Sequence, residues 1–389
     1  MKSLPGDWSG AVVFAAGTPW DGQRLPDQHI AERLSARVPV LYVDPPEWRG
    51  RPWSSAAGRL DLVRPGLARL TPYGVPGIER PLLHTINDRL VRRAIRQALA
   101  VLHARARVLV LCSCHELMGS ADEELSVFYG TDDFVAGTSL ARIPVNRLRR
   151  QEARHLGNAD HIVAVSPELT DGWRARGFDV TLIANGVDDQ LFAGTDAACL
   201  PGDVLLAGPI VGFVGFLSNR IDLGLLETIA ARGRSLLLVG PRQLSFEIDR
   251  IARLLDFPNV AWVGPKAFEE LPSYLRVMDV GITPYTDTAF NRASFPLKTL
   301  EYLAAGRGAV ATDLPSTRWL DSDLVRIATG REGFADAVDA ALAEPRTDEL
   351  VRARRELAHR NSWDARADEF AQLLGLPERT TSSRDRLRG

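Results

Sequence analysis

Cysteine is scarce in this chain, which has three, Cys112, Cys114 and Cys199, among 389 residues. An odd number excludes complete pairing into disulfides, and the spacing matches neither a zinc ribbon nor a thioredoxin-like pair. The run Cys112-x-Cys114-His115 is too compressed for a tetrahedral zinc site with ordinary ligand spacing. We therefore expect reduced thiols, as in a cytoplasmic protein, and no metal centre at this run.

An excess of charge and long apolar runs are absent as well. The 47 basic and 49 acidic side chains leave a formal charge of −2, which gives no electrostatic footprint for duplex nucleic acid and favours a small ligand. No apolar run approaches the ~18 residues of a membrane-spanning helix. Pro5, Asp7 and Trp8 interrupt the region where an export signal would be continuously apolar. The sequence predicts a cytoplasmic protein without a membrane span.

What is present is an alternation of short, β-branched apolar runs with longer Arg/Ala/Leu segments of helical spacing. One series of runs lies at residues 11–16, 38–44, 107–112, 125–130, 161–166 and 180–185, and a second at residues 209–215, 234–240, 259–264, 277–284, 308–313 and 324–328. Such alternation is typical of βαβ units and parallel sheets. The sequence predicts an α/β protein with two Rossmann-like, doubly wound domains that face a cleft.

The predicted domain bounds follow from the two series. Residues 1–190 form the first domain and residues 208–360 the second, with an irregular linker near residues 190–207 that is rich in Gly and Asp. A helix over residues 361–375 is expected to pack back on the first domain. The polar and basic residues 377–389 are expected to form a disordered tail.

Three strands of the second series end in glycine, at Gly215, Gly240 and Gly264. Ligands of open α/β sheets bind outside the carboxyl ends of the strands, and glycine there lets the backbone approach a ligand closely. A simple turn is the alternative for any one of the three. Three in one domain favour a binding site.

The segment "NRASFPLKTLEYLAAGRGAVATD" at residues 291–313 places Lys298 and Glu301 three residues apart near a helix start marked by Pro296. A helix N-terminus beside a lysine suits a diphosphate, and a carboxylate suits vicinal hydroxyls such as those of a ribose. The alternative is an intrahelical ion pair that contributes about 0.2–0.5 kcal/mol. The spacing alone leaves both interpretations open.

This segment resembles the donor domain of GT-B glycosyltransferases, specifically the retaining family 4, at Lys298, Glu301, Tyr302, Ala304 and Gly306. The resemblance extends to FVGFLSNRIDLGLLETIA, to YLRVMDVGITPYTDT and, in the first domain, to ADHIVAVSPELT and IANGVDDQLF. The opening VVFAAGTPWDGQRLPDQHIAERL is similar to a subgroup that includes enzymes of teichuronic acid and other bacterial surface glycans. The resemblance as a whole covers the chain to about residue 375.

The resemblance implies a retaining transferase that moves a sugar from a nucleotide-diphosphate sugar to a hydroxyl acceptor without a metal ion. Lys298 would bind the diphosphate and stabilise the leaving group, and Glu301 would bind the ribose. The other donor-binding residues would be Gly215, Arg220, Gly240, Arg242, Asn291, Phe295, Pro296 and Leu297.

The sequence departs from the family pattern at two places. Ala293 stands where the family commonly has a second glutamate that reaches the donor sugar, which leaves the identity of the sugar open. Asp132 and Asp133 stand where many relatives have a histidine, and either could act as a general base or simply cap the following turn. Trp20, Gly22, Arg24 and His115 are the candidates for the acceptor or phosphate loop, with a packed role as the alternative for His115.

The sequence leaves three other functions open: a nucleotide-sugar epimerase, a phosphorylase on the same fold, and a non-catalytic nucleotide-sugar binding protein. The last is suggested by Ala293, which replaces the expected glutamate. The acceptor of a transferase would be a bacterial glycan or a natural product. A membrane-linked acceptor would bring the protein into peripheral contact with the bilayer, although the sequence shows no strongly basic amphipathic stretch to mark a docking face.

Overall fold

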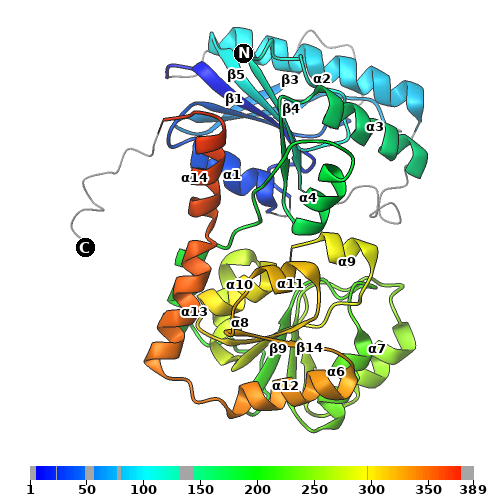
Figure 1. Ribbon diagram of the computed structural model, residues 1–389, viewed down its shortest axis with the longest axis vertical. Helices are drawn as coiled ribbons and strands as arrows, with labels where there is room; N and C mark the ends of the chain where they lie inside the picture. Colours follow the sequence, from blue (N-terminus) through cyan, green and yellow to red (C-terminus); the bar gives the residue numbers. More distant parts are fainter. Residues whose placement is uncertain are drawn as a thin grey trace, which may run out of the picture. The chain divides into compact units, whose positions relative to one another are not determined.

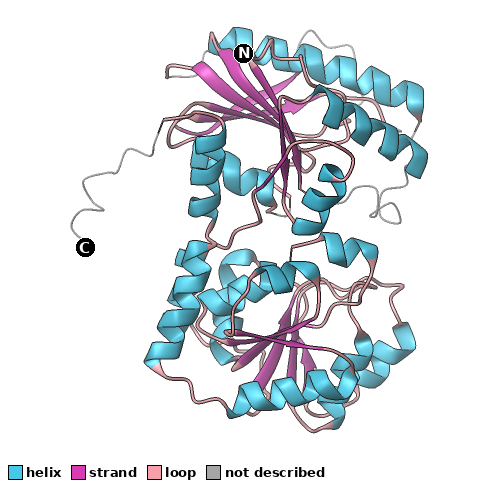
Figure 2. Ribbon diagram, viewed as in Figure 1, coloured by secondary structure: helices cyan, strands magenta, loops and turns pink. Residues whose placement is uncertain are grey.

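The computed structural model describes residues 6–22, 24–48, 57–76, 80–131, 144–295 and 297–377. The chain divides into a first unit, Met1–Ala184 with Arg366–Gly389, and a second unit, Asn185–Ala365. The division falls directly after the last strand of the first sheet, before the linker that the sequence predicts. Figures 1 and 2 show that each unit is a sheet covered by helices on both faces.

The first unit contains an eight-stranded sheet with the order β3-β4-β2-β1-β5-β6-β7-β8. Its neighbouring strands are parallel except for β3 and β4, which pair antiparallel. The strands are β1 (Ser9–Ala15), β2 (Val40–Val43), β3 (Gly58–Arg64), β4 (Leu67–Pro72), β5 (Arg105–Leu111), β6 (Leu125–Gly130), β7 (His161–Ala164) and β8 (Val180–Leu182). Six of these were predicted, and the β3–β4 hairpin was missed.

The helices of the first unit are α1 (Pro26–Leu34), α2 (Pro81–Leu102), α3 (Val145–Asn158) and α4 (Pro167–Arg174), and α14 (Trp363–Leu373) belongs to it from Arg366 onward. Helix α4 begins where a sequence signal marks it, because the Ser166 side chain accepts a hydrogen bond from the Leu169 N–H and Pro167 occupies the first turn. In α14, Phe370 packs edge-on against Tyr129 of β6, with ring centroids 4.9 Å apart. The end of the predicted C-terminal helix is therefore part of the first unit.

The second unit contains a six-stranded, all-parallel sheet with the order β11-β10-β9-β12-β13-β14. Its strands are β9 (Ile210–Val214), β10 (Ser235–Val239), β11 (Val260–Trp262), β12 (Val280–Thr283), β13 (Gly308–Thr312) and β14 (Val325–Ala328). Each lies within one of the six predicted runs. The prediction of two parallel-rich, Rossmann-type sheets is confirmed.

Helices of the second unit are α5 (Asp189–Ala193), α6 (Leu223–Ala231), α7 (Ile248–Leu255), α8 (Leu271–Val277), α9 (Ala289–Ala293), α10 (Leu297–Ala304), α11 (Pro315–Trp319), α12 (Arg331–Ala343) and α13 (Asp348–Arg360). The prediction of an irregular linker near residues 190–207 was wrong for its first part, which holds α5 and a 3-10 turn at Gly194–Ala197. Asp188 caps α5, and Asp196 accepts ion pairs from Arg307, Arg346 and Arg355. These are tertiary partners that no local period reveals.

Helix α10 lies close to the second sheet because β12 has no side chain at Gly281. A Cβ atom there would lie 2.1 Å from the ring of Tyr302, which is on α10. The Tyr302 hydroxyl accepts a hydrogen bond from the Val214 N–H at 2.9 Å and donates one to the Ile282 carbonyl at 3.2 Å. These contacts fix α10 over the carboxyl ends of β9 and β12. Within the described ranges, no helix is both long and apolar enough to cross a membrane.

Candidate active site

Three glycine-ended strands of the second unit converge at one edge of its sheet. The Gly215 N–H donates to the Val239 carbonyl at 2.9 Å, and the Gly240 N–H donates to the Gly264 carbonyl at 2.8 Å. Gly240 has φ +134°, and a Cβ atom there would lie 2.0 Å from the Gly215 carbonyl oxygen. Only glycine fits at position 240, because any side chain would push apart two loops whose backbones are in contact.

Arg242 and Trp262 form one wall of this loop cluster. The Arg242 guanidinium carbon lies 5.1 Å from the centroid of the Trp262 ring, a cation–π arrangement. The indole N–H of Trp262 donates to the Gly240 carbonyl at 2.9 Å. The Arg242 Nε atom is buried and has no hydrogen-bond partner among the described residues. The wall thus presents an aromatic face and a guanidinium to the loops that follow β9 and β10.

The structure brings Arg220 and Asn291 together, although 70 residues separate them in the sequence. The Arg220 Nε–H donates to Asn291 Oδ1 at 2.8 Å, and Asn291 Nδ2 donates to the Arg220 carbonyl at 3.0 Å. The guanidinium also lies over the rings of Tyr285 and Phe290, at 5.3 and 4.7 Å. Asn291 therefore orients the Arg220 side chain, a role that the sequence did not reveal.

Lys298 and Glu301 form an ion pair on the first turns of α10. The ammonium donates to both carboxylate oxygens, at 2.8 and 2.9 Å. The Lys298 side chain is 24% exposed and that of Glu301 is 7% exposed, so the carboxylate is largely buried and the ammonium is open on one side. The intrahelical pair that the spacing left open is thus present, and the open side of Lys298 still leaves access for an anion.

Tyr285 is a phenol near the charged side chains of this site. Burial raises the pKa of the Tyr285 hydroxyl, and the nearby positive charges of Arg220 and Lys298 lower it in part. Of the two cations, Arg220 stacks directly on the Tyr285 ring. Arg220 and Lys298 both follow strands of the second sheet at its carboxyl edge, where two cations suit a multiply charged anion.

The remaining donor-site predictions lie between α9 and α10. Phe295 packs edge-on against Trp319 with ring centroids 5.6 Å apart, and the Leu297 N–H donates to the Phe295 carbonyl at 2.9 Å. Pro296 lies outside the described residues. Ala293 is buried on α9, so the position at which the resemblance led us to expect a second glutamate holds a small apolar group.

In the first unit, the loop after β1 is held by backbone contacts. The Trp20 N–H donates to the Asp44 carboxylate at 2.8 Å, and the Gly22 N–H closes a tight turn at 2.9 Å. The guanidinium of Arg24 is paired with Glu32 of α1. In this conformation, binding an anion would require Arg24 to exchange that partner or share it. Asp132 and Asp133 lie outside the described residues.

His115 follows β5 and contacts two residues of α2 that the sequence analysis did not single out. Its Nδ1 atom lies 2.6 Å from Asp88 Oδ1, and its ring stacks on His84 with centroids 4.9 Å apart. The packed interpretation of His115 therefore holds for this conformation. The available signal was His84-x-x-x-Asp88, which puts both side chains on one helix face. Nothing in the sequence shows that His115 meets that face.

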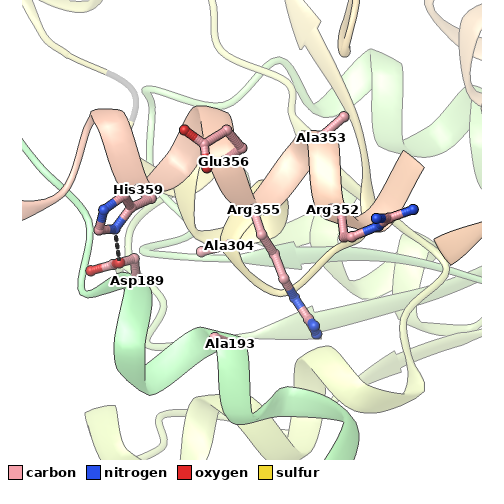
Figure 3. Close-up of a pocket in the computed structure, with 8 residues that line it drawn as sticks. All are labelled: Asp189, Ala193, Ala304, Arg352, Ala353, Arg355, Glu356 and His359. Carbon is pink, nitrogen blue, oxygen red and sulfur yellow. Dashed lines mark hydrogen bonds and ion pairs between the residues drawn. The ribbon is translucent and has the colours of Figure 1, made fainter. Parts of the chain in front are cut away.

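A cavity of ≈ 540 Å³ in the second unit is lined by residues of α5, α10 and α13 (Figure 3). Its charged lining includes His359 and Asp189, whose Nδ1 and Oδ2 atoms lie 2.8 Å apart, and Arg355. The cavity contacts α10 at Ala304, its last residue, about 9 Å along the helix axis from Lys298. None of the predicted donor-site residues lines this cavity. The chemistry of the carboxyl edge is therefore separate from it.

Comparison with known proteins supports the fold and the class of the second unit. Residues 208–344 match the family of glycosyl transferases group 1. Over 241 residues, the chain is 29% identical to TuaH of Bacillus subtilis (strain 168), which is described as a glycosyltransferase of teichuronic acid biosynthesis. That alignment covers 59% of this chain, and it spans 60% of the length of the curated relative.

Two solved structures extend the likeness over nearly the whole chain. Sucrose-phosphate synthase from Thermosynechococcus elongatus is 19% identical with a TM-score of 0.73, covering 93% of this chain and 97% of its own. Anabaena HepE, solved in complex with UDP and glucose, is 15% identical with a TM-score of 0.68, covering 94% and 99%. The fold of this chain is the GT-B fold of glycosyltransferases, and most of its second unit matches the group 1 family.

Proposed function

We propose that this protein is a glycosyltransferase that transfers a sugar from a nucleotide-diphosphate sugar to a hydroxyl acceptor. The observation that carries the proposal is that Arg220, which stacks on Tyr285, and the Lys298–Glu301 ion pair follow strands of the second sheet at its carboxyl edge, inside the segment that matches the group 1 glycosyl transferases. The UDP and glucose in the HepE structure are ligands of that protein, and they suggest a uridine nucleotide as the first donor to test here.

The proposed chemistry uses charge that is already in position. The diphosphate would take hydrogen bonds from Lys298 and Arg220, while Glu301 would accept from the ribose hydroxyls. Lys298 would exchange Glu301 for the diphosphate when the donor binds. As the glycosidic bond then breaks, negative charge develops on the leaving diphosphate, and the cations already in contact with it stabilise that charge. This arrangement requires no metal ion. Retention of configuration, by attack of the acceptor from the face that the diphosphate leaves, is part of the proposal.

The acceptor residues are proposed in the first unit. Asp132 or Asp133 would orient or deprotonate the acceptor hydroxyl, and Trp20, Gly22 and Arg24 would line its path. A bacterial surface glycan is the acceptor class we propose, because the teichuronic acid biosynthesis protein TuaH is a relative. The proposed location is the cytoplasm, where nucleotide sugars are available.

A membrane-linked acceptor is supported by one face of α2. Leu82, Ile86, Arg89, Arg93 and Arg96 follow one another at spacings of four and three residues, and all five are exposed. Leu82 is 80% exposed. Two aliphatic side chains followed by three guanidiniums on one helix face suit the boundary of an anionic bilayer, where the first insert and the others bind phosphates.

Co-sedimentation with phosphatidylglycerol vesicles tests this docking face. The double variant Leu82→Ser, Ile86→Ser should reduce the bound fraction several-fold, whereas Leu205→Ser, which removes a leucine that is 93% exposed in the second unit, should not. Equal binding by all three proteins, or no binding by the wild type, would contradict membrane docking through α2.

A thermal-shift and turnover experiment tests the function itself. Purified protein is heated with UDP, GDP, dTDP and ADP, alone and as nucleotide sugars, because selective binding raises the apparent melting temperature by mass action. The donor that binds is then incubated with lipid-linked and soluble glycan acceptors, and release of the nucleoside diphosphate is followed. We expect one nucleotide to be preferred and release to depend on acceptor. No shift with any nucleotide would refute the transferase proposal, and binding without turnover would favour a non-catalytic binding protein.

A further inference from the structure

His84, Asp88 and His115 form a buried imidazole–carboxylate cluster in the first unit. His84 and Asp88 lie one turn apart on α2, and His115 lies in the loop after β5. The exposed fractions of the three side chains are 4%, 10% and 8%. Buried polar groups of this kind need partners, and here each finds its partner within the cluster.

The donor atoms of the cluster converge. His84 Nδ1 lies 3.1 Å from one oxygen of Asp88, and His115 Nδ1 lies 2.6 Å from the other. One ligand atom from each of the three residues lies within 4.8 Å of the others, and the two rings stack at an interplanar angle of 20°. The second nitrogen of His84 is 3.4 Å from the amide nitrogen of Gln151, a residue of α3 that contacts the His84 ring on the side away from Asp88.

The ligand chemistry of the cluster suits a transition-metal cation. One carboxylate oxygen and two imidazole nitrogens are a donor set that Zn²⁺ and its neighbours in the first transition row accept.

We propose that His84, Asp88 and His115 bind a single divalent transition-metal cation, with Zn²⁺ as the representative ion. Bonds of about 2.0–2.1 Å in tetrahedral geometry would place the ligand atoms about 3.4 Å apart. His84 and His115 contact different oxygens of Asp88. When the cation replaces the shared protons, the carboxylate would turn to offer one oxygen, and the three ligand atoms, now within 4.8 Å of one another, would move to that spacing. Three protein ligands leave one coordination position for water or another ligand.

The site is independent of the donor chemistry proposed above, which uses residues of the second unit and needs no metal. Its predicted effect is to join α2 to the loop after β5. In the metal-free protein the Gln151 amide nitrogen can donate to the far nitrogen of His84, 3.4 Å away. With a cation on Nδ1 the far nitrogen becomes an N–H donor, and Gln151 would turn its amide oxygen toward it, an atom that is buried without a partner among the described residues. Gln151→Ala should therefore weaken the cation about 10- to 100-fold while leaving all three ligands in place.

Zinc titration of chelator-stripped, full-length protein tests the proposal. Isothermal calorimetry should give one Zn²⁺ per chain, and the double variant His84→Asn, His115→Asn should lose it. His103→Asn is the matched control, because His103 is exposed at the end of the same helix and its left-handed conformation, φ 52°, accepts asparagine. Substituting Co²⁺ should give ligand-field bands without a thiolate charge-transfer band, which separates this site from binding at Cys112, Cys114 or Cys199.

Two results would overturn the proposal. One is a wild type that takes up no Zn²⁺ at micromolar concentration, and the other is a double variant that is folded by circular dichroism and still binds one ion. If the double variant does not fold, Gln151→Ala and the Co²⁺ spectrum of the wild type decide. Unchanged affinity in Gln151→Ala together with a thiolate band would place the ion elsewhere.

Discussion

Replacing Lys298 with alanine separates the two roles of the ion pair on α10. In the ligand-free protein, Lys298 neutralises a carboxylate that is 7% exposed, and its own side chain is 24% exposed. Removing one partner costs up to about 1 kcal/mol for exposed pairs and about 3–5 kcal/mol for fully buried pairs. Intermediate burial predicts a loss of about 2 kcal/mol in the free energy of unfolding.

The effect on ligand binding should depend on the diphosphate. A hydrogen bond to a charged group contributes about 1.5–3 kcal/mol, and Lys298 must first leave Glu301, so we expect the lower end. That corresponds to about 10-fold weaker binding of the preferred nucleoside diphosphate. The corresponding nucleoside, which has no phosphate, should bind Lys298→Ala as it binds the wild type. Glu301→Ala should weaken both ligands, because the ribose is common to them.

Calorimetric titration of the nucleoside diphosphate and the nucleoside measures this difference, and urea unfolding measures the stability term. Arg234→Ala is the control, since Arg234 forms a 2.7 Å ion pair with Asp339 and directly precedes β10, at the edge of the sheet opposite the predicted site. It should change stability slightly and affinity not at all. Equal weakening of nucleoside and diphosphate by Lys298→Ala, or less than twofold weakening of the diphosphate, would refute the assigned role.

Three further predictions concern packing and charge. Burial raises the pKa of Asp27 to about 6, so the charge of this carboxylate destabilises the folded state above that pH. Asp27→Asn, which can keep its contact to Tyr42, should raise the free energy of unfolding at pH 8 by at most about 3 kcal/mol. Urea titrations should show this gain vanishing as the pH falls to 4. Gly240→Ala should lower the free energy of unfolding in urea by more than about 3 kcal/mol, because its Cβ atom would clash with the Gly215 carbonyl. Gly264→Ala should lower it by about 1–2 kcal/mol, since φ is +72° there but a Cβ atom meets nothing within 4 Å. Similar losses for the two variants would contradict the clash at Gly240. Tyr302→Phe leaves the Val214 N–H without its acceptor and should lower the melting temperature through a loss of about 1–3 kcal/mol, and an unchanged melting temperature would argue against that bond.

The strands of the second unit could be predicted because strands buried on both faces of a parallel sheet are continuous apolar runs. Every residue of β9 is buried, and its sequence, IVGFV, has no polar side chain. The β3–β4 hairpin was missed because β3 lies at the edge of the first sheet and its sequence, GRLDLVR, is partly polar and partly exposed. Edge strands depend on a partner, and the choice of partner is a tertiary property.

Some features of the candidate site could likewise be predicted from the sequence, and others could not. The sequence by itself placed Lys298 and Glu301 on one side of a helix start after a strand, because spacing and helix geometry are local. Only the tertiary structure decided that the two side chains pair, that Glu301 is buried, and that Asn291 orients Arg220 across 70 residues of sequence. The same holds for His115, which reaches Asp88 only because β5 and α2 pack in one unit. Periodicity is a property of neighbouring residues and can be read from the sequence. A polar contact between distant segments depends on how their helices and strands pack, and a single sequence carries no local signal for that packing.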